Sequence, residues 1–495
     1  MNKQSEKLAK AIAYEAKKKK ERDEDKRPAF HVTPTTGWCN DPNGFSRFGE
    51  EYHLFYQYYP YENKWGPMHW GHCRTKDFIK WEELPCALAP DMEYDGQGCF
   101  SGTAVEHEGK HILMYTSVLE KDLEDGTHMV RQTQSIAIGD GENYEKVAEN
   151  PVITADCLPE GSSPVDFRDP KIWKEDGRFY ALIGSKAEDG SGQLALFTSE
   201  DALHWNYEKM IDQCKNRYGK MWECPDFFAL DGCQVLIVSP QFMRAEGLEF
   251  HNGNNSIYFT GDYEKETMTY TRGDARQVDY GMDFYAPQTV ETTDGRRVMI
   301  AWLQSWDNFM TPEDMDWTGL MTIPRELHVE DGSLVQLPVR EIENYYTGER
   351  SCSYENVTLE NQSAELDGIT GRSFDMTVEV KKEDLEGFSI LLACDDENYT
   401  ELYYNRYQEL FTVDRTYSGL VRDVICSRSM KVANEKETIK FRIVMDKYTI
   451  EVFANDGKQA MTTLIYTDLK SQGIVFSSDG KATFSVTQHT ITMPE

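Results

Sequence analysis

Short runs of β-branched and aromatic residues, broken by Gly, Asp and Asn, fill most of the chain after Pro28. Runs of this kind are typical of β-strands, so the pattern predicts an all-β protein from residue 29 onward. Residues 1–28 differ, because they are rich in Ala, Lys and Glu and carry only a thin stripe of apolar positions. We expect them to form a short helical extension that packs on the main body.

Five segments repeat one plan, in which a turn with an acidic residue and Gly leads into an alternating apolar strand. Their sequences are EEYHLFYQYYP, EGKHILMYTSV, DGRFYALIGSK, DGCQVLIVSP and DGRRVMIAWLQ, each preceded by a matching strand. The segments begin near Glu51, Glu108, Asp176, Asp231 and Asp294, roughly sixty residues apart. Five repeats of about four strands each predict a five-bladed β-propeller over residues 29–338.

The composition changes after the stretch LVQLPVREIENYY, where residues 339–354 are predicted to form a linker with a short helix. Long alternating strands rich in Glu, Thr and Val follow from residue 355 to residue 495. At least seven such strands in this length predict a two-sheet β-sandwich. The sandwich has no obvious catalytic cluster, so we expect it to be structural or to contribute modestly to substrate binding.

Charge and cysteine usage exclude several classes of function. The chain has 85 acidic and 52 basic residues and a formal net charge of −33, which repels nucleic acids and anionic membrane surfaces. No apolar run approaches the roughly 20 residues that cross a bilayer. Eleven cysteines without a C-x-x-C pair favour reduced thiols over a disulfide framework or a zinc site. We therefore expect a cytoplasmic protein with no nucleic-acid or membrane partner.

Acidic residues recur at one position of the predicted propeller. The first strands of three units carry Asp41 in WCNDPNG, Asp169 in FRDP, and Glu223 with Asp226 in ECPD. Innermost strands line the axis of a propeller, so these carboxyl groups are predicted to meet at one mouth. Each motif has an ordinary alternative, namely a β-turn, an ion pair or a loop. Their shared register favours a common site.

Two kinds of chemistry suit such carboxylates, a divalent cation site and acid–base catalysis on a sugar. No D-x-D-x-D-G loop occurs, and His69 and His72 lack an evident third ligand, so we expect no metal and no cofactor. Glycoside cleavage needs one carboxyl group to donate a proton and another to attack or to activate water. Relative to proline, Asp226 has the parity of Asp41 and Asp169 and Glu223 does not, so the pattern leaves the proton donor open.

A set of motifs along the chain resembles glycoside hydrolase family 32, the invertase and β-fructofuranosidase family. The motifs WCNDPNG, QYYPYENKWGPMHWGH, GCFSGTAV, FRDP, ECPD, MTIPREL and LVQLPV stand in that family's order and spacing. The resemblance runs from about residue 29 to the C-terminus and is greatest to bacterial cytoplasmic hydrolases of sucrose or sucrose 6-phosphate. It implies a five-bladed propeller followed by a β-sandwich.

The resemblance also implies residue roles. Asp41 would be the nucleophile, Glu223 the acid/base and Asp169 the stabiliser of the transition state. The residues expected to shape the fructose pocket are Asn40, Gln57, Trp65, Phe100, Ser101, Arg168 and Trp302. Cys39 departs from the Met that is commoner before the Asn-Asp pair, and Cys224 is expected to pack behind the acid.

The sequence thus predicts a retaining β-fructofuranosidase that cleaves terminal β-D-fructofuranosides through a covalent fructosyl-enzyme. Sucrose, sucrose 6-phosphate and short fructo-oligosaccharides are the candidate substrates. A fructan exo-hydrolase or a fructosyltransferase would use the same site. A non-catalytic carbohydrate-binding propeller has no reason to keep all three acids. Exposed edge strands of a sandwich can pair with a second copy of the chain, so the sequence leaves open whether the protein is a homo-oligomer.

Overall fold

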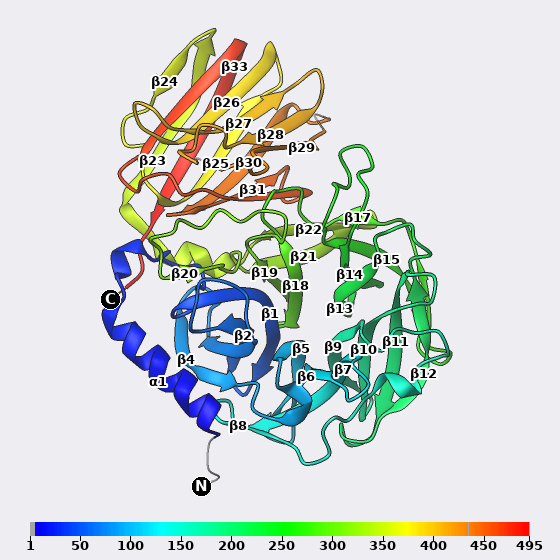
Figure 1. Cartoon of the computed structure of the whole chain (residues 1–495). Coiled ribbons are helices and arrows are strands. Elements are labelled where there is room, and N and C mark those ends of the chain that lie inside the picture. The colour runs from blue at the N-terminus through cyan, green and yellow to red at the C-terminus, as the bar shows by residue number, and fades with distance from the viewer. Residues whose placement is uncertain (1–4, 421, 434, 495) are drawn as a thin grey trace.

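Five sheets of mainly antiparallel strands surround one axis, and a larger body of strands stands beside them (Figure 1). The computed structural model describes residues 5–420, 422–433 and 435–494. The all-β class, the five-bladed propeller and the C-terminal sandwich predicted from the sequence are confirmed. In the described part of the chain, no helix is long and apolar enough to span a membrane.

Helix α1 (Glu6–Glu21) forms the predicted N-terminal extension and packs on the first blade. The Ser5 side chain caps it by accepting a hydrogen bond from the backbone N–H of Leu8 at 3.2 Å. The buried Glu15 carboxylate accepts a hydrogen bond from the backbone N–H of Cys86, in the outer strand of that blade, at 3.0 Å. A 3-10 turn, η1 (Glu24–Lys26), leads from the helix toward the propeller.

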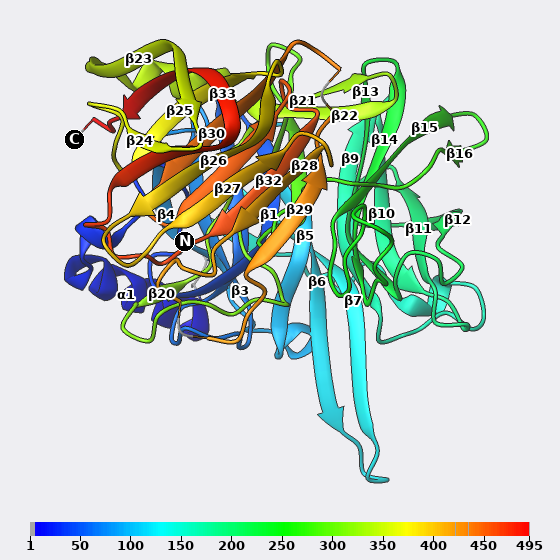
Figure 2. The same cartoon turned by 90° about the horizontal axis from the view of Figure 1, so that it is seen from above.

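The blades follow one another along the chain. The first contains β1 (Gly37–Phe48), β2 (Glu51–Tyr59), β3 (His69–Thr75) and β4 (Trp81–Leu88), and the second β5 (Gly98–His107), β6 (Lys110–Asp122), β7 (His128–Gly139) and β8 (Tyr144–Lys146). The third contains β9 (Phe167–Glu175), β10 (Arg178–Lys186), β11 (Gly192–Ser199) and β12 (Asn206–Gln213). Turns η2 (Glu93–Asp95) and η3 (Ala155–Cys157) connect these blades. Strands β6 and β7 project beyond the propeller as a long hairpin (Figure 2).

The last two blades complete the ring. The fourth contains β13 (Met221–Leu230), β14 (Cys233–Gln241), β15 (Ile257–Glu264), β16 (Thr269–Arg272) and β17 (Arg276–Gln277), and the fifth β18 (Tyr285–Glu291), β19 (Arg297–Trp302), β21 (Arg325–Glu330) and β22 (Ser333–Pro338). Between β19 and β21, the short strand β20 (Trp317–Thr318) pairs in parallel with β1 of the first blade. This pairing joins the last part of the ring to the first.

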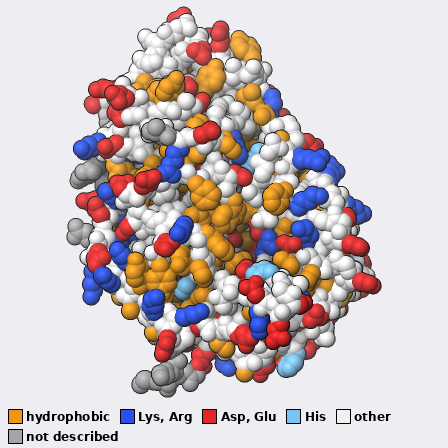
Figure 3. All heavy atoms as spheres, viewed as in Figure 1, with side chains coloured by type: hydrophobic (Ala, Val, Ile, Leu, Met, Phe, Trp, Pro, Cys, Tyr) orange, Lys and Arg blue, Asp and Glu red, His pale blue; other side chains and the backbone are white. Residues whose placement is uncertain are grey.

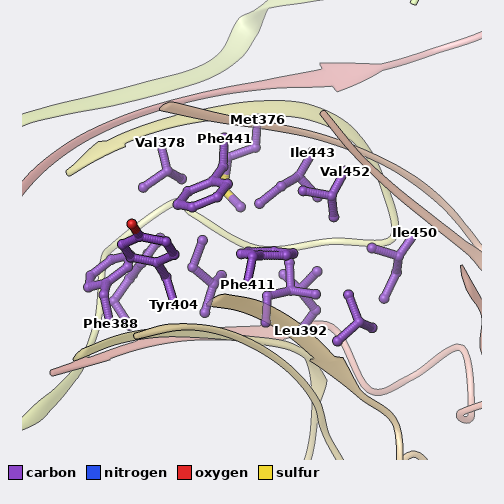
Figure 4. Close-up of a cluster of buried hydrophobic side chains, with 14 of the residues drawn as sticks. Met376, Val378, Phe388, Leu392, Tyr404, Phe411, Phe441, Ile443, Ile450 and Val452 are labelled. Atoms are coloured by element: carbon purple, nitrogen blue, oxygen red, sulfur yellow. The ribbon is translucent and has the colours of Figure 1, made fainter. Parts of the chain in front are cut away.

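The sandwich consists of two sheets that share one long strand, β33 (Gly473–Ile491). One sheet contains β24 (Ser363–Glu365), β26 (Leu385–Cys394), β27 (Thr400–Asn405), β28 (Leu410–Asp414) and β29 (Ser427–Lys431), and the other β23 (Tyr346–Glu360), β25 (Ser373–Lys381), β30 (Thr438–Asp446), β31 (Thr449–Ala454) and β32 (Gln459–Leu464). Alternate residues of the two sheets meet in an apolar core, where Val378 and Phe441 face Tyr404 and Phe411 (Figure 4).

The connection between the two bodies is shorter than the predicted linker of residues 339–354. Turn η4 (Arg340–Tyr345) is the expected short helix, but β23 begins at Tyr346. Ser351 already pairs with His489 of β33, so the boundary expected at residue 354 falls inside a strand. The partner strand lies more than a hundred residues away in sequence, and local composition carries no sign of such a pairing.

Buried ions fasten the sandwich to the propeller. The Arg325 guanidinium of β21 pairs with Glu451 of β31 and lies 2.9 Å from Asp279, with all three side chains fully buried. His31, just before the first blade, lies between the Asp446 and Glu451 carboxylates, 2.9 Å from each. Burial lowers the pKa of His31, but hydrogen bonds to the two carboxylates outweigh burial and raise it to about 9. His31 is therefore an imidazolium at neutral pH.

We predict that His31→Gln destabilises the protein by about 3 kcal/mol or more, because two buried carboxylates lose a cation. The His31 pKa is higher in the folded chain than in the unfolded one, where it is near 6.5. The stabilisation is therefore complete below pH 6.5 and is lost as the pH rises through about 9. Thermal melts of both proteins across this range measure the effect.

The matched control is His204→Gln, which removes an exposed histidine paired with Asp201. We expect this variant to stay within about 0.5 kcal/mol of the parent at every pH. A difference between the parent and His31→Gln that is as large at pH 10 as at pH 6 would show that His31 does not act as a cation.

Candidate active site

The innermost strand of every blade is irregular at the same level. Regular pairing with the next strand is interrupted between Cys39 and Pro42, Phe100 and Gly102, Arg168 and Lys171, Glu223 and Asp226, and Tyr285 and Gln288. Such β-bulges bend a strand and redirect its side chains. Five bulges around one axis therefore turn a set of side chains toward the same place.

Three of these bulges contain a non-glycine residue with positive φ. Asp169, Cys224 and Ala286 have φ values of +64°, +46° and +51°, and a proline follows each of them. The left-handed region is costly for such residues and is often used at functional sites. The bulges of the third, fourth and fifth blades therefore share one strained conformation.

When the five innermost strands are aligned on the residue after the bulge, two positions of each strand face the axis. Each of these positions forms a ring of five residues, one from each blade. The first ring contains Asn40, Phe100, Arg168, Glu223 and Tyr285, and the second contains Asp41, Ser101, Asp169, Cys224 and Ala286. Glu223 differs in sequence parity from Asp41 and Asp169 because it belongs to the first ring, whereas they belong to the second. Both rings contribute carboxyl groups to the same site.

Asp41 lies in the second ring with one oxygen bound and the other free of protein partners. Its Oδ2 accepts a hydrogen bond from Ser101 Oγ at 2.7 Å and lies 3.6 Å from Cys224 Sγ. Its Oδ1 has no hydrogen-bond partner. Burial, and next the charge of Glu223, raise the pKa of Asp41 above its ordinary value.

Asp169 is held from its backbone and from its side chain. Its backbone N–H donates to Thr116 Oγ1 at 2.8 Å, and its Oδ2 accepts from the backbone N–H of Cys224 at 3.1 Å. Cys224 Sγ lies 3.7 Å from the same oxygen, so one sulfur contacts both Asp41 and Asp169. Burial raises the Asp169 pKa to about 7, with the negative charges of Glu223 and Asp41 adding to the effect and Arg168 opposing it.

Both carboxylate oxygens of Glu223 are hydrogen-bonded. Arg168 donates to Oε1 from Nε at 3.0 Å and from Nη2 at 2.9 Å, and the Tyr285 hydroxyl donates to Oε2 at 2.6 Å. The Arg168 Nε atom also lies 3.9 Å from Asp169 Oδ2. The carboxylates of Glu223 and Asp169 therefore share one guanidinium.

Asp226, the alternative proton donor, lies outside this group. Its side chain is fully buried, its Oδ1 lies 2.8 Å from Lys171 Nζ, and its Oδ2 accepts from the backbone N–H of Thr289 at 2.6 Å. Lys171 and Asp226 each stand three residues beyond their first-ring residue, Arg168 and Glu223. They form a buried ion pair deeper in the axis, so Glu223 is the acid of the ECPD motif that faces the pocket.

A pocket of about 310 Å³ opens over the two rings. Its lining contains nine of the ten predicted site residues, Asn40, Asp41, Gln57, Trp65, Phe100, Ser101, Arg168, Asp169 and Glu223, together with Gln132, Gln241 and Trp306. Hydrophobic side chains gather near the centre of this face of the molecule (Figure 3). An open polar floor with aromatic walls suits a small polar ligand such as a sugar.

Trp302 is the predicted pocket residue that the structure places elsewhere. It is fully buried at the end of β19, with its ring 5.9 Å from Trp38 and 5.0 Å from Trp306. Trp306, four residues later in the loop, lines the pocket instead. The wall residue therefore comes from the loop after the strand, and Trp302 supports it from behind.

Sequence reasoning missed Tyr285, Gln132 and Gln241. Tyr285 precedes Ala-Pro as Glu223 precedes Cys-Pro, so the repeat register contained the signal for it. Gln132 comes from the second blade and accepts from Arg168 Nη1 at 3.3 Å. Gln241 ends β14, opposite Met221. No local motif marks these two glutamines.

The candidate metal ligands lie apart from the pocket. His72 Nε2 is 2.9 Å from His53 Nδ1 in the buried part of the first blade, and burial lowers the pKa of His72. His69 Nδ1 lies 2.9 Å from the backbone oxygen of Pro67. Across residues 5–420, 422–433 and 435–494, no group of three or more His, Cys, Asp or Glu side chains could hold a metal ion.

Cys39 and Cys224 are both buried beside the rings. Cys39 belongs to the apolar core between the first blade and its neighbours and is not part of the pocket lining. Burial, together with the charges of Asp169 and Asp41, raises the pKa of Cys224 well above its ordinary value. Cys224 therefore stays a thiol and contacts the two carboxylates as a neutral group.

The site thus combines the Asp41 carboxylate, held by Ser101, with a second carboxylate, Glu223, fixed by Arg168 and Tyr285. Two carboxyl groups in different environments are what glycoside cleavage requires. Propeller and site together define a glycoside hydrolase.

Comparison with known proteins gives the family. Residues 31–338 match the glycosyl hydrolases family 32 N-terminal domain, and residues 341–492 match the family 32 C-terminal domain. The chain belongs to glycosyl hydrolase family 32.

Individual relatives cover nearly the whole chain. A sucrose-6-phosphate hydrolase of Zymomonas mobilis is 36% identical over 475 residues, which cover 92% of this chain and 90% of that protein. A raffinose invertase of Escherichia coli is 33% identical and covers 92% of this chain and 93% of that protein. The structure of a mutant Bombyx mori GH32 β-fructofuranosidase in complex with sucrose superposes with a TM-score of 0.85 at 30% identity, covering 99% of this chain and 100% of that one.

We predict that Asp226→Asn destabilises the protein, because the Lys171 ammonium would then be buried without its counter-charge. The expected loss is about 3–5 kcal/mol in the free energy of unfolding, measured by chemical denaturation. The matched change Glu223→Gln keeps a hydrogen-bonding group between Arg168 and Tyr285 at the pocket surface. It should cost less than about 1.5 kcal/mol. A larger loss of stability in Glu223→Gln than in Asp226→Asn would contradict the assignment of Asp226 as a structural acid and Glu223 as the pocket acid.

Proposed function

We propose that the chain is a retaining β-fructofuranosidase that hydrolyses the terminal β-D-fructofuranoside bond of sucrose. The observation that carries this proposal is the position of Asp41 and Glu223, which belong to adjacent rings of one propeller axis and line one pocket. Membership of family 32 and the sucrose bound by the Bombyx mori relative support it.

In the first step, a carboxylate oxygen of Asp41 forms a bond to the anomeric carbon of the fructosyl unit. The bond from that carbon to the glycosidic oxygen breaks, and Glu223 gives its proton to the departing oxygen. Ser101 orients the Asp41 carboxylate for the attack by donating a hydrogen bond to its Oδ2 at 2.7 Å. The products of this step are free glucose and a fructosyl-enzyme.

In the second step, the Glu223 carboxylate takes a proton from water as the water oxygen attacks the same carbon. The bond to Asp41 breaks, fructose leaves with retained configuration, and both carboxyl groups return to their starting states. Arg168 and Tyr285 fix the Glu223 side chain for both proton transfers. Neither step of this reaction requires a cofactor.

Asp169 is assigned the stabilisation of the transition state through the hydroxyl groups of the fructose ring. It lies in the same ring as Asp41 and contacts the same Cys224 sulfur. Asn40, Gln57 and Ser101 supply further polar groups in the pocket, and Trp65 and Phe100 supply its aromatic wall.

A fructosyltransferase or fructan exo-hydrolase remains the alternative within the same chemistry. Transfer and hydrolysis differ only in whether a sugar hydroxyl or water attacks the fructosyl-enzyme. Chromatography of products at high sucrose distinguishes them: equal glucose and fructose indicate hydrolysis, and excess free glucose with new trisaccharides indicates transfer.

The remaining assignments concern the whole protein. We place all catalytic groups in residues 29–338 and give the sandwich of residues 355–495 a supporting role. All eleven cysteines are free thiols, which supports a cytoplasmic location. A homo-oligomer formed through the sandwich is part of the same proposal.

We predict that Asp41→Asn lowers sucrose turnover by at least about 10³-fold, because an amide cannot form the fructosyl-enzyme. Glu223→Gln should lose about 10²- to 10⁴-fold on sucrose and less on a fructoside with a good leaving group, which departs without a proton. Azide should partly restore the Glu223→Gln rate by replacing activated water. Near-parental sucrose turnover by purified Asp41→Asn protein would reject the mechanism.

A second prediction concerns the pH profile. Asp41 attacks only when ionised, and its pKa lies above the ordinary 3.8, so kcat/KM should fall with decreasing pH already above that value. On a fructoside with a good leaving group, which departs without a proton, the acid limb should persist in Glu223→Gln, because Asp41 must still be ionised to attack. Glu108→Gln, at an exposed turn, is the control and should leave the limb unchanged. Loss of the acid limb in Glu223→Gln would contradict its assignment to Asp41.

A further inference from the structure

Two large aromatic side chains are exposed just outside the pocket lining. Phe242 is 72% exposed and Phe309 is 48% exposed, although neither belongs to the lining itself. Exposed aromatic side chains beside a binding pocket mark a surface that a ligand can cover. Their position relative to the pocket is fixed by their neighbours in sequence and in space.

Phe242 directly follows Gln241, a pocket residue at the end of β14. Its φ of +56° is a left-handed conformation, which is unfavourable for a bulky residue. The ring lies in solvent, so burial of the side chain does not offset the unfavourable backbone conformation. Strained residues of this kind persist where the exposed position has a use.

Phe309 reaches the pocket through an aromatic stack. Its ring lies 5.8 Å from Trp38, and Trp38 stacks on the pocket residue Trp306 at 6.0 Å. Asp307, between Trp306 and Phe309, accepts hydrogen bonds from the backbone N–H and the side-chain amide of Asn254, at 2.9 Å and 3.1 Å. The loop of Phe309 is therefore fastened to the segment that follows Phe242.

The charge of the pocket disfavours anionic substituents. Among the described residues that line it, Arg168 is the one cation, and its guanidinium is engaged by Glu223 and by Asp166. Asp41, Asp169 and Glu223 contribute carboxyl groups to the same surface. A phosphate dianion near this surface would meet like charges without a free counter-charge, which lowers its affinity.

We propose that Phe242 and Phe309 form an outer subsite that stacks an uncharged sugar carried by the glucosyl leaving group. The proposal rests on the proposed function and specifies its substrates: neutral extended β-fructofuranosides are preferred to phosphorylated ones. A pocket of about 310 Å³ is at the small end of ligand sites, so it holds the fructosyl unit and part of the leaving group. Anything further out on the leaving group meets the two phenylalanines.

Raffinose and sucrose 6-phosphate test this directly, because both carry their substituent on the same glucosyl oxygen, O6. Raffinose has a neutral galactosyl unit there, and sucrose 6-phosphate has a dianion. We expect the parent protein to show a kcat/KM for raffinose at least about tenfold above that for sucrose 6-phosphate.

The double variant Phe242→Ala/Phe309→Ala should lower kcat/KM for raffinose by about 5- to 20-fold, mainly through KM, and that for sucrose by less than about twofold. The control is Tyr407→Ala, which removes an aromatic side chain that is 73% exposed on the sandwich, and all ratios should stay unchanged. An unchanged raffinose-to-sucrose ratio in the double variant would overturn the outer subsite.

Arg244 supplies the opposite test, because it is an exposed cation two residues after Phe242. Sucrose 6-phosphate turnover that exceeds raffinose turnover in the parent and drops in Arg244→Gln would overturn the proposal in favour of a phosphate site. Calorimetry with raffinose and Asp41→Asn protein, with and without the two phenylalanines, measures the subsite without turnover. Weaker binding after their removal supports the subsite even if sucrose hydrolysis, and with it the proposed function, were to fail.

Discussion

Mutual repulsion among three carboxyl groups that line one pocket is the constraint around which this site is built. Asp41, Asp169 and Glu223 belong to three different blades, and burial, with neighbouring negative charges as a further cause, raises the pKa values of both aspartates. The Arg168 guanidinium counters the repulsion by binding Glu223 and lying 3.9 Å from Asp169. Carboxylates held close together in this way differ in protonation, which is what acid and nucleophile require. Without that cation, the repulsion between Glu223 and Asp169 would have no counter-charge in the pocket.

The propeller fixes the positions of the three carboxyl groups, which the Arg168 cation alone cannot do. A bulge at one level of each inner strand turns two residues per blade toward the axis, and strained backbone at Asp169 and Cys224 fixes their direction. Below them, the Lys171–Asp226 ion pair fills the axis. At the side of the propeller that faces the sandwich (Figure 1), His31 and Arg325 bind the sandwich through buried carboxylates. Rigid strands on every side therefore hold the pocket open toward solvent at one mouth.

Much of this organisation could be read from the sequence, because repeats and prolines are local signals. The five repeats predicted the blades, and the acids near proline predicted Asp41 and Asp169 but left Glu223 and Asp226 open. The resemblance to glycoside hydrolase family 32 favoured Glu223. Tyr285 precedes Ala-Pro as Glu223 precedes Cys-Pro, but the Tyr-Ala-Pro triplet has no acidic residue that would mark it as part of a catalytic site. Trp302 and Trp306 could not be told apart, since loop geometry after β19 decides which ring faces the pocket. The start of β23 depended on pairing with β33, a contact between distant segments that composition does not reveal.

The most direct test of the central claim is the chemical identity of the group that carries the fructosyl unit. Glu223→Gln protein mixed with a fructoside that has a good leaving group should accumulate the fructosyl-enzyme, because the base for the second step is missing. Rapid acid quenching, proteolysis and mass spectrometry then locate the added fructosyl group. The account predicts it on the peptide that contains Asp41. A fructosyl group on Asp169 or on Cys224, or inverted fructose released without any adduct, would contradict it.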